Sequence, residues 1–185
     1  MCRKTVALIL IICLAGYSAA AAEDAVLTNI IVTNTWDDLL VYLSVEGAFR
    51  DEMKKAILSG VPTTFSFLIG LHRVRNLWPD KEIADIQVSH TIKYDNLKKE
   101  FTVTRSWENN QPILTKSFEK ARQLMADVDG VKVAPLKWLE KGERYQIKAK
   151  AELSNITLPF YLHYVLFFLS LWDFETDWYT IDFVY

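Results

Sequence analysis

The stretch Ile86-Gln-Val-Ser-His-Thr-Ile-Lys-Tyr94 decides the fold class of this chain of 185 residues. Apolar and aromatic side chains, together with His90, occupy every second position, and polar side chains lie between them. Successive side chains of a β-strand point to opposite faces, so this alternation predicts a half-buried antiparallel strand. His90 lies on the apolar face, where we expect a hydrogen-bonded histidine of the core rather than a metal ligand.

The same alternation recurs on both sides of this stretch. It predicts further strands whose apolar stripes cover residues 39–45, 65–71, 101–107 and 145–153. About eight strands result when three weaker segments are added: 26–34, 112–115 and 178–185. Many strands and few helices predict a mainly β fold, either an antiparallel β-sandwich or a curved sheet.

Two or three short helical insertions are expected among these strands. Residues 48–58 place apolar side chains on one helical face before Gly60. Residues 117–128 predict a second helix, capped by Ser117, with Val128 facing inward and Gly130 near its end. Residues 159–171 predict a third.

The N-terminus has the pattern of a secretory signal peptide. A basic pair, Arg3 and Lys4, precedes an apolar run at 6–15, and small residues predict cleavage near Ala20 to Ala22. An uncleaved anchor helix is the alternative. We therefore expect a signal over 1–22 and a single β-rich domain over 23–185.

Composition restricts the possible functions. Both cysteines precede residue 23, so the processed chain would have no disulfide, cysteine nucleophile or thiolate metal site. Loss of Arg3 and Lys4 lowers Lys plus Arg from 21 to 19 against 23 acids, a net charge of −4. Such a charge gives no basis for nucleic-acid binding.

An apolar run over 158–172 leads into alternating acids and aromatics at 173–178. The run is shorter than a membrane span, and two uses remain open: burial between sheet layers, or docking on a membrane or a partner. The candidate interaction surface comprises Phe160, Tyr164, Phe167, Phe168, Trp172, Asp173, Glu175, Asp177 and Trp178.

The three acids of this segment suggest two possible chemical roles. In an extended chain Asp173, Glu175 and Asp177 would share one face, as a calcium site or a carboxylate pair of a glycosidase requires. The ordinary interpretation is a solvated strand face with Phe174, Thr176 and Trp178 turned inward. No catalytic, cofactor or metal site is expected, because the histidines are widely spaced and no nucleophile elbow or phosphate loop occurs.

A second, weaker surface candidate surrounds Trp78. Arg73, Arg75 and Lys81 flank this tryptophan, a basic-aromatic combination that would suit anionic lipid headgroups or a glycan. A polar loop end is the more ordinary interpretation.

Several segments together resemble one family. They are Ser59-Gly-Val-Pro62, Trp78-Pro-Asp80, Tyr94 before a turn with Phe101-Thr-Val-Thr-Arg105 after it, and the tail from Leu171 to Tyr179. Their order and spacing resemble bacterial domain-of-unknown-function family 4390. The resemblance implies an exported envelope protein, and it brings no activity or catalytic residue with it.

Three function classes follow. The leading expectation is an exported, non-enzymatic binding or accessory module of the bacterial envelope that contacts a protein partner or the membrane surface. The alternatives are a small outer-membrane barrel, which the charged helices and lysine-bearing strands disfavour, and an enzyme acting on envelope polymers.

Overall fold

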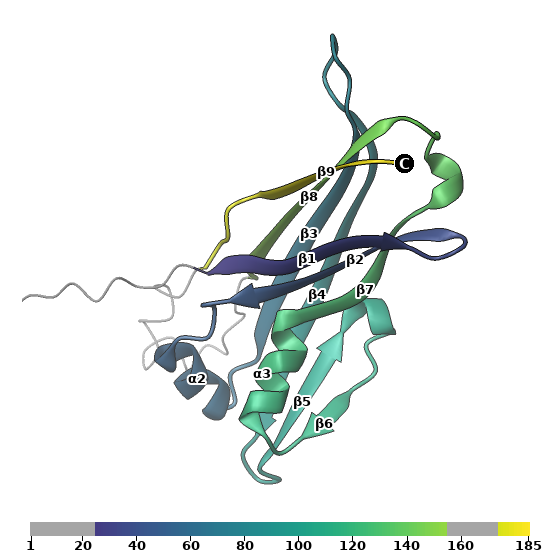
Figure 1. Cartoon of the computed structure of the whole chain (residues 1–185). Helices are drawn as coiled ribbons and strands as arrows, with labels where there is room; N and C mark the ends of the chain where they lie inside the picture. The colour runs from purple at the N-terminus through teal and green to yellow at the C-terminus, as the bar shows by residue number, and fades with distance from the viewer. Residues whose placement is uncertain (1–24, 155–173) are drawn as a thin grey trace, which may run out of the picture.

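The computed structural model describes residues 25–154 and 174–185, in which nine strands form two antiparallel sheets (Figure 1). A three-stranded sheet has the order β1-β2-β7, and a six-stranded sheet has the order β6-β5-β4-β3-β8-β9. The strands are β1 (Val26–Asn34), β2 (Asp38–Glu46), β3 (Thr63–Arg73), β4 (Lys81–Asp95), β5 (Glu100–Arg105), β6 (Ile113–Thr115), β7 (Asp127–Pro135), β8 (Arg144–Leu153) and β9 (Tyr179–Val184). The predicted mainly β antiparallel fold is confirmed.

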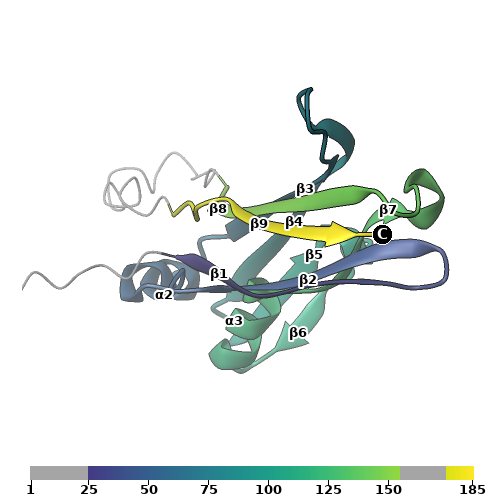
Figure 2. The ribbon, with the colours of Figure 1, turned by 45° about the horizontal axis from the view of Figure 1, so that its top comes forward.

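The two sheets form two layers with the apolar core between them (Figure 2). The predicted stripes of β2, β3 and β8 face this core, and Val41, Phe65 and Ala149 are fully buried. β3 lies inside the larger sheet, where Phe65 is paired with His90 of β4 and Leu153 of β8. The register places alternate side chains of all three strands on the same buried face.

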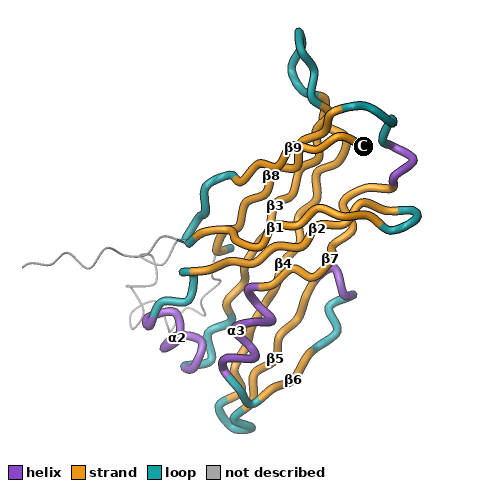
Figure 3. The backbone as a smooth tube through the Cα atoms, viewed as in Figure 1, coloured by secondary structure: helices purple, strands orange, loops and turns teal. Residues whose placement is uncertain are grey.

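Within the described part of the chain two α-helices interrupt the strands, as predicted: α2 (Asp51–Leu58) and α3 (Phe118–Ala126) (Figure 3). Ser117 caps α3, because its hydroxyl accepts a hydrogen bond from the Lys120 amide at 3.3 Å. α3 contacts β2 of one sheet and β4 and β5 of the other. Two short 3₁₀ turns, η1 (Ser106–Glu108) and η2 (Leu136–Trp138), complete the elements, and the predicted helix at 159–171 lies outside the described residues.

Strand β7 was not predicted, and the helix expected over 117–128 is shorter than expected. Val128 faces the core from β7, not from α3. The β2–β7 register shifts between Val41 and Leu43, opposite Gly130, which has a φ of +76°. The irregular register interrupts the alternation of apolar residues in β7, so the sequence shows no clean period-two pattern there.

A buried polar cluster joins β4, β5 and α3. Trp107 donates its indole N–H to His90 Nε2 at 2.9 Å, and His90 Nδ1 lies 3.0 Å from the Met125 carbonyl oxygen. An indole only donates, so His90 accepts at Nε2 and must carry its proton on Nδ1, which donates to Met125. The predicted hydrogen-bonded core histidine is confirmed.

Arg105 completes this cluster and is only 4% exposed. Its Nε donates to the Leu124 carbonyl oxygen at 3.1 Å, and its Nη1 lies 3.3 Å from Glu108 and 3.5 Å from Asp129. Burial, reinforced by the charge of Arg105, lowers the pKa of His90 from its ordinary 6.5 to about 4. His90 is therefore neutral at physiological pH.

Candidate functional site

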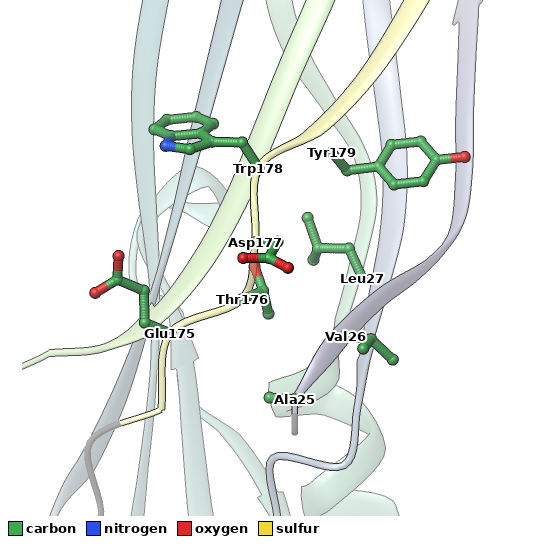
Figure 4. A pocket seen from close by; sticks show the side chains of 8 residues that line it. All are labelled: Ala25, Val26, Leu27, Glu175, Thr176, Asp177, Trp178 and Tyr179. Carbon is green, nitrogen blue, oxygen red and sulfur yellow. The ribbon is translucent and has the colours of Figure 1, made fainter. Parts of the chain in front are cut away.

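A groove opens where the starts of β1 and β9 lie side by side (Figure 4). β1 and β9 are edge strands of their respective sheets, so each has one edge without a partner in the described part of the chain. The groove encloses about 330 Å³. Its walls are formed by Ala25, Val26, Leu27, Glu175, Thr176, Asp177, Trp178 and Tyr179.

Residues 174–176, the last two of which line the groove, are fixed to the larger sheet. The Leu153 amide donates to the Phe174 carbonyl oxygen at 2.9 Å, and the Phe174 ring packs edge-on against Phe65, with centroids 4.7 Å apart. Thr176 is buried, and its hydroxyl accepts a hydrogen bond from the Ala151 amide at 3.0 Å. These contacts confirm the inward direction predicted for Phe174 and Thr176, and they hold the entry to β9 in place.

Trp178 does not face inward as the strand interpretation predicted; its side chain is 55% exposed. Glu175 is bridged to Glu152, whereas Tyr179 is paired with Ala149, so the 175–179 segment has one residue more than its partner. The extra residue reverses the alternation between Thr176 and Tyr179. Trp178 is therefore available at the surface for contact with another molecule.

Lys150 supports Trp178 on the outer face of β8. Its ammonium group lies 5.5 Å from the centroid of the indole ring and forms an ion pair with the carboxylate of Glu175. A cation over the ring limits how the indole can move. The groove thus presents a held, exposed aromatic surface beside a paired charge.

The structure brings together only part of the predicted surface. Glu175, Asp177 and Trp178 line the groove, and the remaining predicted residues lie outside the described part of the chain: Phe160, Tyr164, Phe167, Phe168, Trp172 and Asp173. Sequence reasoning missed the contribution of Val26 and Tyr179, both exposed. Their strands were predicted, but nothing in the sequence indicated that β1 and β9 would be neighbouring edges.

The described acids do not gather into a metal site. Within residues 25–154 and 174–185 there is no group of three or more histidine, aspartate or glutamate side chains placed to hold a metal ion. Glu175 is paired with Lys150, and Figure 4 shows its carboxylate pointing away from that of Asp177. Across the same residues, no helix is long and apolar enough to span a membrane.

The residues predicted around Trp78 lie at the β3–β4 turn. Arg73 is engaged by two acids, at 2.6 Å from Glu140 and 3.0 Å from Glu143, and these hydrogen bonds raise its pKa. Arg75 and Lys81 are exposed, as is Trp78. Arg75, Lys81 and Trp78 therefore remain as an exposed basic and aromatic group, whereas the charge of Arg73 is paired.

The fold and the groove define an antiparallel β-sandwich with an aromatic site between two edge strands. A family model described as Domain of unknown function (DUF4390) matches residues 22–182, and the chain belongs to this family. No curated protein and no solved structure gave a match.

Proposed function

We propose that this protein is an exported, non-enzymatic module of the bacterial envelope that binds an extended segment of a protein partner at the β1–β9 groove. The observation that carries the proposal is the exposed Trp178 at a groove between β1 and β9, two strands that each have one edge without a partner among the described residues. An unpaired edge offers backbone N–H and C=O groups to an added strand, and adjacent hollows accept its side chains.

The chemistry of the groove supports binding rather than catalysis. Its walls contain aliphatic, aromatic, threonine and carboxylate side chains, and among the described lining residues no nucleophile is placed beside a base. Partly exposed Tyr179 and Val26 on opposite walls can contact the two sides of one inserted chain. Aromatic anchors of this kind contribute most of the binding energy in many protein interfaces.

Site-specific photocrosslinking in intact cells tests the partner. A photoreactive phenylalanine analogue at position 178 should capture one protein repeatedly, whereas the same analogue at Leu114 should not. Leu114 is a matched control because it is also an exposed apolar residue on an edge strand, β6. Equal capture at both positions, or none at 178, would contradict the proposal.

Export needs a separate test. Envelope fractions should contain a processed chain that begins at Ala21 or Glu23, as N-terminal sequencing would show. Recovery of the full-length chain from the cytoplasm alone would overturn this part of the proposal.

A further inference from the structure

Three turns meet at the end of the sandwich away from Trp178, and we call them the turn end: residues 35–37, 74–80 and 136–143. The Leu136 amide donates to the Asp37 carbonyl oxygen at 2.7 Å, which joins the first turn to the third. Arg73 is paired with Glu140 and Glu143, and the Val74 amide donates to the Arg144 carbonyl oxygen at 2.9 Å. These contacts join the third turn to the β3–β4 turn, which projects beyond the sheets (Figure 1).

Three large apolar side chains of the turn end are mostly exposed, and a fourth, Trp138, is half exposed. Trp36 is 98% exposed, Leu77 92% and Trp78 74%. Turns of this kind usually carry small or polar residues, because an apolar side chain there gains nothing from the chain's own core. These three residues therefore make almost no contribution to packing.

Trp36 and Trp78 each stand beside two cations that have no ion-pair partner in the described residues. Trp36 lines a hollow together with Lys137 and Lys141, and Trp78 lines another with Arg75 and Arg144. The acids Asp38 and Glu143 also line these hollows, but Lys132 and Arg73 pair with them. Asp37 is the remaining acid among the lining residues. The same combination, an exposed indole with two unpaired cations, thus occurs twice at one end.

We propose that the turn end docks on a phospholipid surface, with Trp36, Leu77 and Trp78 entering the interface and the four cations contacting headgroup phosphates. Indole rings prefer the headgroup level of a bilayer, and long basic side chains reach phosphates beside them. Cations near an anionic surface add attraction that salt screens. This inference rests on the proposed export of the chain but not on the β1–β9 groove.

A lipid surface fits these tips better than a protein does. The apolar side chains stand on separate turns from both sheets, whereas a stable interface between two folded proteins typically buries roughly 800 Å² on each partner. A fluid interface accepts separate projections without a matching shape. The bilayer is therefore the occupant that the geometry favours.

Vesicle flotation with the purified full-length processed protein tests the proposal. The wild type should float with vesicles of phosphatidylethanolamine and phosphatidylglycerol, and the triple variant W36S/L77S/W78S should bind far less, by about tenfold for each anchor removed. Trp178→Ser is the matched control: it removes an exposed tryptophan from the groove and should float like the wild type. All variants keep residues 155–173, so their differences report on the turn end.

A second variant tests the cations. K137Q/K141Q/R75Q/R144Q should bind less at low salt and approach the wild type at high salt, where charge attraction is screened. Flotation of W36S/L77S/W78S equal to wild type, or no flotation of a folded wild type, would overturn the proposal. Loss of flotation in Trp178→Ser would also overturn it, whereas failure of crosslinking at position 178 would count only against the proposed partner.

Discussion

The cluster around His90 and the turn end invert the usual distribution of side chains in opposite ways. At the cluster, polar and charged groups lie inside the protein, and His90, Arg105 and Trp107 each have hydrogen-bond partners there. At the turn end, the apolar side chains of Trp36, Leu77 and Trp78 lie outside and contact little of the chain. The cluster is explained entirely by folding, because every partner belongs to the chain. Folding does not explain the exposed apolar side chains of the turn end, and we therefore propose that they contact a surface outside the protein.

The largest expected effect is at Arg105. Arg105→Met keeps most of the volume but leaves the buried Leu124 carbonyl oxygen without its donor, and we expect roughly 2–4 kcal/mol of destabilisation. Arg122→Met is the control, since Arg122 is half exposed and among the described residues pairs with Glu119 alone, and it should cost about 1 kcal/mol or less. Urea unfolding measures the free energy of unfolding of both variants. Equal losses would contradict a larger contribution of the buried cluster to stability.

The next effect is the pH dependence of stability that His90 imposes. The pKa of His90 in the folded chain, about 4, lies below its ordinary value of 6.5. Between these two pH values the unfolded chain binds a proton at His90 that the folded chain does not bind. The contribution of neutral His90 to the free energy of unfolding should therefore be fully present above pH 6.5. It should be lost as the pH drops, by roughly 3 kcal/mol at pH 4. Unfolding of wild type and His90→Gln at pH 7 and pH 4 isolates this contribution. An identical loss in both proteins would contradict it.

The smallest expected effect on stability comes from removing the exposed apolar side chains of the turn end. W36S/L77S/W78S should unfold within about 0.5 kcal/mol of the wild type, because these side chains are already exposed in the folded protein. The same urea titration gives the answer. A loss of several kcal/mol would mean that the turn end packs against some other part of the chain.

The sequence predicted what local alternation can encode. The stripe from Ile86 to Tyr94 identified β4 and the core position of His90, since a strand's period is independent of the rest of the fold. It did not predict β7, where an irregular register at Gly130 interrupts the alternation.

The functional surfaces were less predictable for a different reason. Trp178 was among the predicted residues, but its outward direction depends on a one-residue slip that only the pairing with β8 reveals. The groove with Val26 depends on the sheet order, and the placing of Trp36 and Trp78 at one end depends on which turns are joined; neither leaves a pattern in the sequence.

Fluorescence quenching by brominated lipids tests lipid docking most directly. Bromine on the acyl chains near the headgroups quenches only indoles that enter the bilayer, so wild-type fluorescence should fall when vesicles are added. W36F/W78F keeps aromatic anchors at both tips, so it should still float with vesicles, but its quenching should fall to what the half-exposed Trp138 contributes. Equal quenching in W36F/W78F and wild type, or vesicle binding without any quenching, would contradict insertion by the turn end.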